Sequence, residues 1–431
     1  FFIFIITSSY NYRYPLSRIL LIQIEFNHFT SKPMPKSSAP LPPPAFNVMV
    51  KPVGPVCNLA CDYCYYLSKE NLFPGSDFCM TDNLLENFTR QYIQAQHVPQ
   101  VSFIWQGGEP ALAGLDFFRK AVEYQKQYAS PGVRIENAIQ TNGTLLTDEW
   151  CTFFKENNFL VGISLDGPPD LHNVYRKDRA GKGSADRVLA GLALLKQHEV
   201  EYNVLCTVHA ANADHPLEVY RYLRDDLDST FIQFIPIVER DNKTGYQVGN
   251  KVTSRSVSGV QYGRFLNQIF DEWIKRDVGK VFVQIFDVAL SKWVGNQSGL
   301  CIFSETCGQA LLLEHNGDLF SCDHFVEPKH KLGNITKTKL VDLVQSHSQH
   351  QFGIAKRDKL PKYCLECEVR FACNGGCPKN RILHTPDGEY GLNVLCDGYR
   401  AFFNHIDQPM RLMASLLKQH RPPAEIMSIN K

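Results

Sequence analysis

Three cysteines in the N-terminal part of the chain have a spacing that suits a metal cluster. They are Cys57, Cys61 and Cys64, in the order C-x3-C-x2-C, and Tyr65 and Tyr66 follow them. Three thiolates on one short loop can bind three irons of a [4Fe–4S] cube and leave the fourth iron open. An open iron can bind the amino and carboxylate groups of S-adenosylmethionine, whose one-electron cleavage yields a 5′-deoxyadenosyl radical. The simpler interpretations are a zinc site that lacks one ligand and three unrelated buried cysteines.

Eight further cysteines lie in the C-terminal part of the chain, which is enough for two four-cysteine clusters. The chain has 14 cysteines in all, and we interpret Cys79, Cys151 and Cys206 as buried or otherwise ordinary thiols. The run C-x2-C-x5-C-x3-C could instead close one or two structural zinc sites, because spacing does not separate zinc from iron and sulfur. The eight cysteines are Cys301, Cys307, Cys322, Cys364, Cys367, Cys373, Cys377 and Cys396.

Polar motifs follow several of the predicted strands. A Gly-Gly-Glu-Pro motif at 107–110 contains Gly108, and glycines there would let the backbone approach the amino group of a ligand. Ser164 ends another strand and can donate to a ribose or a carboxylate, and Arg176 can bind a carboxylate with its forked guanidinium. Taken alone, the glycine motif predicts a turn and Arg176 a solvated surface residue. Their positions after strands favour a binding pocket.

The elements that position these residues alternate between strand and helix. Strands that alternate with amphipathic helices predict parallel β/α units, and six units are too few for a closed eight-stranded barrel. In such barrels the site lies at the carboxyl ends of the strands, where the motifs fall. From 254 to 294 the pattern is helical, with Phe265, Ile269, Trp273 and Ile274 at core spacing. The predicted strands are 47–51, 101–105, 134–140, 160–165, 202–208 and 231–236, and the predicted helices are 83–96, 115–128, 148–157, 185–198 and 216–227.

The composition is that of an ordinary globular protein. The 431 residues are 44% hydrophobic and 21% charged, and 45 basic against 44 acidic residues give a net charge of +1. This balance gives no electrostatic argument for binding nucleic acid or an anionic membrane. No apolar run approaches the roughly 20 residues of a membrane-spanning helix. Cluster thiolates need a reducing compartment, so we expect a cytoplasmic location.

The first 33 residues fit none of these units. Residues 1–6 are apolar, and no methionine opens the sequence. One interpretation is a targeting segment, and the other is translated sequence upstream of a start at Met34, before a flexible proline-rich stretch at 37–44. We favour the second, because a signal peptide needs basic residues before its apolar run. The expectation is therefore a disordered or spurious extension at 1–45.

Together these motifs resemble the radical S-adenosylmethionine enzymes that carry a cysteine-rich SPASM domain. Among them the chain is most similar to the anaerobic sulfatase-maturating enzymes, over about residues 46–413. The resemblance implies an α/β fold with a partial (β/α)6 barrel at 46–253. It also implies a helical linker at 254–298, a SPASM domain with two auxiliary clusters at 299–400, and a C-terminal helix and tail at 401–431.

The resemblance also implies the cofactors, S-adenosylmethionine and three [4Fe–4S] clusters, and the residues that hold them. Tyr63 and Ile237 would contact adenine, although core packing is the alternative for Ile237. Gly108 would lie at the methionine amino group, and Ser164 and Arg176 at the ribose and carboxylate. The open-iron cluster would take Cys57, Cys61 and Cys64. One auxiliary cluster would take Cys301, Cys307, Cys322 and Cys377, and the other Cys364, Cys367, Cys373 and Cys396.

Asp323 is the predicted proton acceptor, because it directly follows Cys322 and matches the aspartate with that role in the family. A solvated turn residue is the alternative. The implied reaction oxidises a cysteine or serine in an unfolded sulfatase segment to Cα-formylglycine without oxygen. The implied partners are the sulfatase and an electron donor such as ferredoxin or flavodoxin. Two other hypotheses remain open: a SPASM maturase that forms thioether or carbon–carbon crosslinks in small peptides, and a zinc-binding scaffold without catalytic activity.

Overall fold

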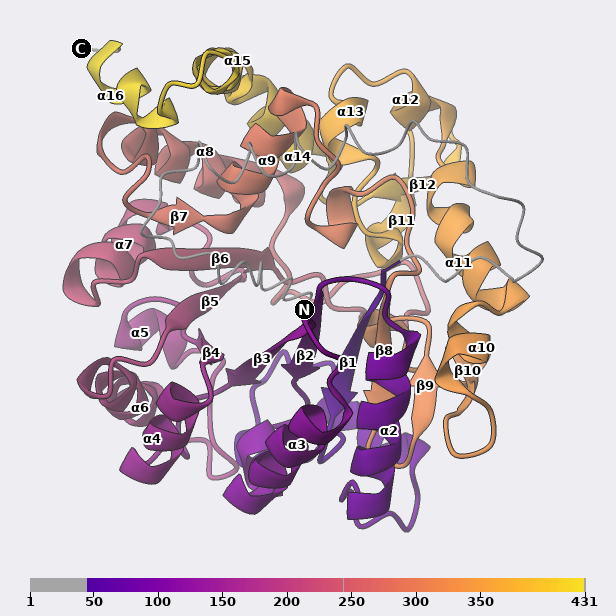
Figure 1. Cartoon of the computed structure of the whole chain (residues 1–431). Coiled ribbons are helices and arrows are strands. Elements are labelled where there is room, and N and C mark those ends of the chain that lie inside the picture. Colours follow the sequence, from indigo (N-terminus) through magenta and orange to yellow (C-terminus); the bar gives the residue numbers. More distant parts are fainter. Residues whose placement is uncertain (1–44, 243, 430–431) are drawn as a thin grey trace.

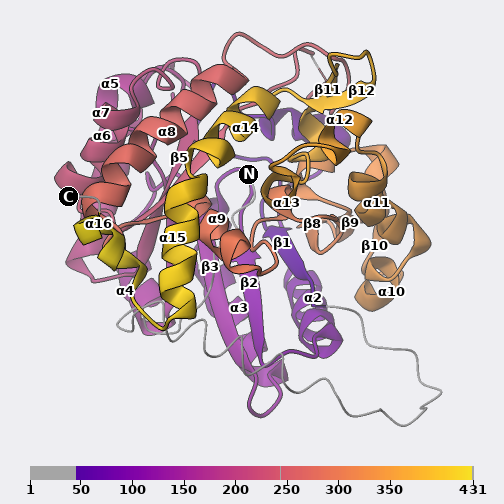
Figure 2. The ribbon, with the colours of Figure 1, turned by 90° about the horizontal axis from the view of Figure 1, so that it is seen from above.

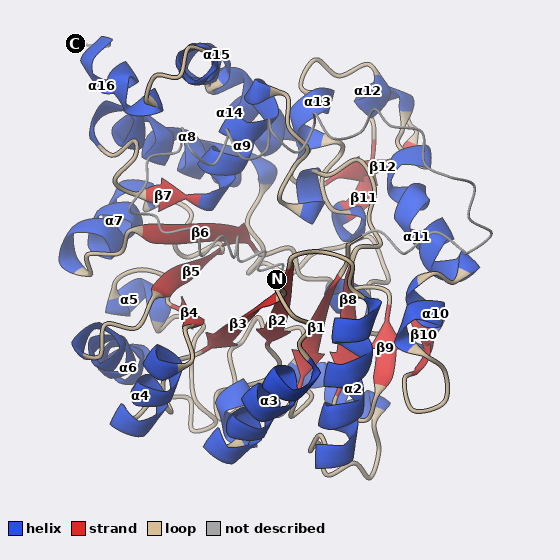
Figure 3. Ribbon diagram, viewed as in Figure 1, coloured by secondary structure: helices blue, strands red, loops and turns tan. Residues whose placement is uncertain are grey.

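The computed structural model describes residues 45–242 and 244–429, and its centre is one ten-stranded sheet. The strands are β1 (Asn47–Lys51), β2 (Gln100–Trp105), β3 (Arg134–Thr141), β4 (Phe159–Ser164), β5 (Tyr202–Val208), β6 (Phe231–Pro236), β7 (Phe282–Val283), β8 (Ala310–Glu314), β9 (Asp318–Phe320) and β10 (Lys331–Asn334). Their order is β10-β9-β8-β1-β2-β3-β4-β5-β6-β7. The sheet curves through the molecule with helices packed outside it (Figure 1, Figure 3). The predicted extension at 1–45 lies, apart from residue 45, outside the described residues.

Strands β1 to β6 form the predicted parallel β/α core. Each pairs in parallel with the next, and each predicted strand agrees with the structure within one residue at either end. The helices of this core are α2 (Asp82–Ala95), α3 (Leu115–Tyr128), α4 (Asp148–Glu156), α5 (Pro169–His172), α6 (Ala185–Gln197) and α7 (Pro216–Arg221). The predicted helix 216–227 differs in its second half, where the chain continues as a π-helix, η3 (Tyr222–Asp226).

Sequence signals explain where two of these helices begin. Thr81 accepts a hydrogen bond from the backbone N–H of Leu84 at 3.3 Å, which caps α2. Thr147 does the same for Trp150 at 3.4 Å, at the start of α4. Such caps satisfy backbone donors that the first helical turn leaves unpaired. Phe88 of α2 is fully buried on the helix face that covers the sheet.

Four strands outside the predicted units extend the sheet at both edges. β8 pairs in parallel with β1, with Leu312 opposite Met49, and β9 and β10 continue the sheet in antiparallel fashion. β7 pairs in parallel with β6 at the opposite edge. Because β8, β9 and β10 come from the predicted SPASM region, that region completes the sheet. It thereby places its own residues beside the end of β1.

The predicted helical linker consists of two helices, α8 (Gly259–Arg276) and α9 (Gln284–Val294). Ser258 and Gln261 form a reciprocal capping box at the start of α8. The predicted core residues Phe265, Ile269, Trp273 and Ile274 are all buried. The single helical stretch expected at 254–294 is interrupted, because Gly279 turns the chain with a φ of +78° before β7.

The C-terminal part of the chain consists of short elements. Helices α14 and α15 pack against α8 and α9 (Figure 2). No helix in the described ranges is both long and apolar enough to cross a membrane. The elements are α10 (Leu340–Val344), α11 (His347–Asp358), α12 (Lys362–Leu365), α13 (Arg370–Cys373), β11 (Arg381–His384), β12 (Tyr390–Asn393), α14 (Cys396–His405), α15 (Asp407–Lys418) and α16 (Ile426–Ile429). Short 3₁₀ helices occur at η1 (Leu67–Leu72), η2 (Pro110–Ala113), η4 (Cys301–Phe303), η5 (Asp323–Phe325), η6 (Pro328–His330), η7 (Pro378–Asn380) and η8 (Pro423–Glu425).

Candidate active site

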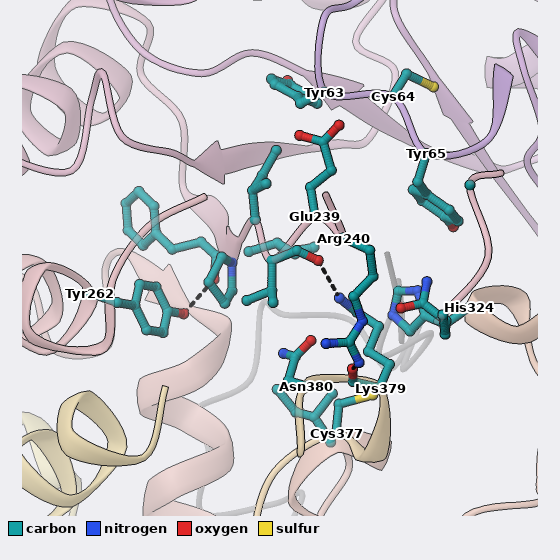
Figure 4. Close-up of a pocket in the computed structure, with 18 of the residues that line it drawn as sticks. Tyr63, Cys64, Tyr65, Glu239, Arg240, Tyr262, His324, Cys377, Lys379 and Asn380 are labelled. Carbon is teal, nitrogen blue, oxygen red and sulfur yellow. Dashed lines mark hydrogen bonds between the residues drawn. The ribbon is translucent and has the colours of Figure 1, made fainter. Parts of the chain in front are cut away.

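A cavity of about 200 Å³ lies between the loop that follows β1 and the C-terminal cysteine-rich region. Tyr63 and Tyr65 line it from the first side, and His324, Cys377 and Lys379 from the other (Figure 4). The chain just after β6 forms a further wall. One cavity therefore joins the predicted radical site to a predicted auxiliary-cluster ligand.

The loop with the first three cysteines is held by backbone hydrogen bonds to the segment after β4. The N–H of Ala60 donates to the carbonyl of Lys177 at 2.8 Å, and that of Asp62 donates to the carbonyl of Tyr175 at 2.9 Å. The side chain of Arg179 donates to the carbonyl of Cys57 at 3.0 Å. The loop is thus positioned by the fold and does not depend on a cluster alone for its shape.

Burial makes the three thiols hard to ionise. It raises the pKa of Cys57 and of Cys61 to about 12, and it also raises the pKa of Cys64. Thiolates at this loop therefore require the positive charge of bound iron, and cluster binding must release protons.

The glycine motif after β2 packs directly on the cysteine loop. A Cβ atom on Gly108 would lie 1.9 Å from the carbonyl oxygen of Val56, so only glycine fits there. The next residue, Glu109, is fully buried and accepts hydrogen bonds from Thr141 Oγ1 and the Asn142 N–H, both at 2.7 Å. Burial raises the pKa of Glu109 to about 7. This motif therefore joins the cysteine loop to the carboxyl end of β3.

Asp166, just after β4, is the centre of a buried hydrogen-bond network. It accepts from the Tyr63 hydroxyl at 2.5 Å, from Arg176 Nε at 2.8 Å and Nη2 at 3.1 Å, and from the Thr207 N–H at 2.9 Å. Burial opposes ionisation of Asp166, but the Arg176 guanidinium and His209 together outweigh it and hold the pKa well below its usual range. The guanidinium predicted to bind the methionine carboxylate thus already binds Asp166 through Nε and Nη2.

The other two predicted S-adenosylmethionine contacts lie at strand ends. Ser164 is buried and accepts a hydrogen bond from Gln140 Nε2 at 2.9 Å. Ile237 lines the cavity, and its backbone N–H donates to the carbonyl of Val208 at 2.8 Å. Its carbonyl accepts from the N–H of Val257 at 3.1 Å. Ile237 therefore borders the cavity, while its N–H and its carbonyl both form hydrogen bonds within the fold.

The eight C-terminal cysteines form two separate groups in space. All thiols of the first group lie within electrostatic reach of one another, and Cys377 belongs to it despite its distance along the chain from Cys301. The second group lines one small cavity. Of the remaining cysteines, Cys151 and Cys206 are buried, and Cys79 is exposed. The first group is Cys301, Cys307, Cys322 and Cys377, and the second is Cys364, Cys367, Cys373 and Cys396.

The surroundings of the first group fit an anionic cluster. Lys356 and Arg381 are 1% and 8% exposed, and neither forms an ion pair with a carboxylate in the described part of the chain. A buried cation is costly unless an anion compensates it, and a cluster with four thiolates does so. Among the described residues, no three His, Cys, Asp or Glu side chains are placed to hold a single metal ion. A four-iron cube holds its thiolates further apart than one tetrahedral ion does.

Asp323 is buried between the cysteine loop that follows β1 and the C-terminal cysteine-rich region. Its carboxylate pairs with Lys51 Nζ at 2.9 Å and accepts a hydrogen bond from the Tyr65 hydroxyl at 2.6 Å. Burial opposes ionisation, but nearby positive charge, that of Lys51 first, and the hydrogen bond from Tyr65 together keep the pKa of Asp323 below its usual range. The structure thus brings the predicted proton acceptor against the cysteine loop, and the solvated-turn alternative is wrong because Asp323 is only 1% exposed.

Sequence reasoning did not select Lys51, Glu109 or Asp166 as members of the site. The signal for Asp166 was its place in the Ser164-Leu165-Asp166-Gly167 motif, and that for Glu109 its place after two glycines. Lys51 ends an apolar strand, and its burial at 1% exposure against Asp323 depends on the pairing of β8 with β1.

Comparisons with known proteins agree with this geometry. Residues 52–223 match the model of the Radical SAM superfamily, and residues 301–368 match that of the SPASM iron–sulfur cluster-binding domain. The chain is 50% identical over 403 residues to the serine-type anaerobic sulfatase-maturating enzyme of Bacteroides thetaiotaomicron, across 91% of this chain and 97% of that one. It is 34% identical over 369 residues to the cysteine-type enzyme of Clostridium perfringens, across 84% and 96%.

A solved structure of native anSMEcpe with bound AdoMet superimposes with a TM-score of 0.78 at 33% identity, covering 86% of this chain and 99% of that one. Fold, site and family matches together define a radical S-adenosylmethionine oxidoreductase with an iron–sulfur SPASM domain. Its cofactors are accordingly iron–sulfur clusters and S-adenosylmethionine. Within that class the chain belongs to the anaerobic sulfatase-maturating enzymes, because it aligns with them over nearly their whole length.

Proposed function

We propose that this chain oxidises a serine or cysteine side chain of a sulfatase polypeptide to Cα-formylglycine, by radical S-adenosylmethionine chemistry and without oxygen. The observation that carries the proposal is the single cavity between the cysteine loop and Cys377, with buried Asp323 beside the loop. The serine-type and cysteine-type relatives support the substrate class.

Three [4Fe–4S] clusters belong to this proposal. The first would be held within 46–253 by Cys57, Cys61 and Cys64, and the two auxiliary clusters within 299–400 by the two cysteine groups described above. When bound, the open-iron cluster and S-adenosylmethionine supply a 5′-deoxyadenosyl radical. Tyr63, Gly108, Ser164, Arg176 and Ile237 would orient S-adenosylmethionine against the cysteine loop. The helical linker 254–298 and the segment 401–431 would pack around these two parts.

The reaction is a two-electron oxidation of the substrate. The Cβ carbon would give up one hydrogen atom to the radical that the bound cofactor supplies. The hydroxyl or thiol would lose its proton to Asp323, and the clusters that the two cysteine groups would hold can take up the remaining electron. Serine gives the aldehyde directly, and cysteine gives a thioaldehyde that water hydrolyses with release of hydrogen sulfide.

Asp323 can accept this proton although it is a weak base at rest. The ion pair with Lys51 and the hydrogen bond from Tyr65 keep the Asp323 carboxylate ionised and fix its orientation. A hydroxyl or thiol on a carbon radical is much more acidic than the same group in the resting substrate, so a weakly basic carboxylate suffices. The buried setting keeps water from competing for the proton.

The substrate would enter as an extended segment before the sulfatase folds. Solved structures of the related anSMEcpe contain bound peptides, one of them Cp18Cys, which supports this mode of entry. A ferredoxin or flavodoxin in the reducing cytoplasm would supply the electron that starts each turnover.

The test uses anaerobically reconstituted enzyme and two peptides that differ only in serine or cysteine at the target position. Formylglycine should form in both, detected as a mass loss at that residue. We expect serine to react faster, because identity is 50% and 38% to serine-type enzymes and 34% to a cysteine-type enzyme. Formation of deoxyadenosine without formylglycine on either peptide would overturn the proposed reaction. The assignment to the radical S-adenosylmethionine enzymes would still stand.

A further inference from the structure

Arg381, the first residue of β11, is a buried cation whose hydrogen-bond acceptors are all neutral. Its Nε donates to the carbonyl of Gly375 at 3.1 Å, and its Nη2 donates to those of Asn374 at 2.8 Å and Gly376 at 3.2 Å. Its Nη1 donates to the carbonyl of Lys356 at 2.5 Å. The side chain is 8% exposed, and no carboxylate in the described ranges pairs with it. Backbone carbonyls therefore fix the position of the Arg381 guanidinium. No carboxylate in the described ranges compensates its positive charge.

The three carbonyls at 374–376 belong to the loop that separates the two cysteine groups. Cys373 precedes this loop and belongs to the second group, and Cys377 follows it and belongs to the first. All three loop residues have positive φ angles, 47°, 70° and 62°; the two glycines adopt this conformation readily, whereas it costs Asn374 free energy. A Cβ on Gly375 would come within 2.9 Å of Arg381 Nη2, so the guanidinium fills the space inside the turn.

The guanidinium lies within electrostatic reach of thiols from both groups. These are Cys377 and Cys307 of the first group, and Cys364 and Cys373 of the second. The other buried cation at this site, Lys356, reaches three thiols of the first group, Cys301, Cys307 and Cys377, but of the second group only Cys373 is recorded beside it. Of these two cations, Arg381 is therefore the one placed evenly between the two groups.

An arginine stays charged under all conditions of interest, and an isolated buried charge is costly. Four-thiolate clusters are anionic, and their reduction potentials depend on nearby charge and hydrogen bonding. A fixed positive charge stabilises the reduced cluster, which carries one more negative charge, so it raises the potential.

We infer that Arg381 is the shared counter-charge of the two auxiliary clusters: it fixes the loop between their ligands and raises the reduction potentials of both. This inference rests on the proposed function, in which these clusters receive the electron removed from the substrate. A higher potential at both clusters favours that transfer from the substrate. Arg381 acts through the clusters and is a positioning residue with no contact to substrate.

The test is a redox titration of the holoenzyme, followed by electron paramagnetic resonance, in the Cys61→Ala background, where only the auxiliary clusters remain. It needs no substrate and no turnover, so its outcome is independent of the proposed reaction. Arg381→Gln removes the charge, and Arg381→Lys keeps it. Lys356→Gln is the matched control, because it removes a buried cation that lies beside three thiols of the first group and one of the second.

Arg381→Gln should make reduction of both clusters at least tenfold less favourable, a shift of about 59 mV to more negative potential. Arg381→Lys should shift both potentials by less than this, and Lys356→Gln should lower the potential of the first group's cluster more than that of the second. Unchanged potentials in Arg381→Gln, or a shift at a single cluster, would overturn the inference. If the Gln variant does not retain iron, Arg381→Lys decides: retained potentials support the shared charge, and a tenfold loss refutes it.

Discussion

Side chains at the carboxyl end of β1 determine where a proton can go. Asp323 could be predicted from its sequence position, because a residue next to a cluster ligand must lie near that cluster. Its partners Lys51 and Tyr65 could not, since they lie far away in the sequence and only sheet pairing brings them together. The pairing of Arg176 with Asp166 was also missed, although the two residues lie ten positions apart, because the sequence does not show how the segment after β4 folds back.

Asp323→Asn should uncouple radical formation from product formation. Asparagine keeps the shape but cannot accept a proton as a carboxylate does. We expect formylglycine to fall by about 10²- to 10⁴-fold, the usual loss of a general base, while deoxyadenosine still forms. Asp318→Asn is the control, because Asp318 is a buried carboxylate of the same sheet that pairs with Lys331. If the Asp323→Asn enzyme forms formylglycine and deoxyadenosine in equal amounts and at wild-type rates, Asp323 is not the base.

Cys61→Ala should abolish cleavage of S-adenosylmethionine and leave the auxiliary clusters. Three cubes correspond to about twelve irons per chain, so iron should fall to about eight. Cys151→Ala, which removes a buried thiol on α4, should keep the full iron content. Iron and sulfide analysis with a deoxyadenosine assay measures both effects. Deoxyadenosine from the Cys61→Ala protein would contradict the position of the radical site.

Single elements were predictable where their signals are local. The six strands of the core are apolar runs bounded by turns, and they match within one residue. The strand β8 is an equally apolar run, but nothing local indicates that it pairs with β1. The π-helix η3 was also missed. A π-helix differs from an α-helix in that its backbone hydrogen bonds span five residues instead of four, and the amino-acid pattern does not show this difference.

The contact between the glycine motif and the cysteine loop predicts a severe effect of Gly108→Ala. The new Cβ would lie 1.9 Å from the carbonyl oxygen of Val56, which forces the two loops apart. We expect loss of iron at the open-iron site and little deoxyadenosine after reconstitution. Gly299→Ala is the matched control, because no atom lies within 4 Å of its Cβ position. Wild-type iron content in Gly108→Ala would show that the loops do not need this close contact.

Glu109, which joins the same loop to β3, predicts a pH dependence. Burial raises its pKa to about 7, above about 4.3 in the unfolded chain. The folded protein therefore binds this proton more tightly, and the resulting stability is present below about pH 4.3 and lost as the pH rises through about 7. Relative to wild type, the Tm of Glu109→Gln should rise between about pH 5 and 8. The exposed Glu123→Gln should give a curve parallel to wild type, and a parallel curve for Glu109→Gln would contradict the prediction.

On the scale of the whole molecule, stability is unevenly distributed. The sheet core is held by buried apolar side chains, while Cys364 and Cys373 of the second cysteine group lie on α12 and α13, each of four residues. Such short elements depend on bound metal for their structure. Removal of iron with an anaerobic chelator should increase hydrogen exchange most at 360–400 and least in β2 to β5. Mass spectrometry of the exchanged peptides measures this, and a uniform increase would show that the clusters support the sheet as well.

The pairing of β8 with β1 has a consequence for biosynthesis. Asn47 lies opposite Ala310, so β1 is an open sheet edge until most of the chain has been translated. At about 5–20 residues per second this interval is on the order of tens of seconds. An open edge can pair with strands of other nascent chains. The order of the strands therefore makes the half-synthesised chain vulnerable to aggregation just where its cysteine loop begins.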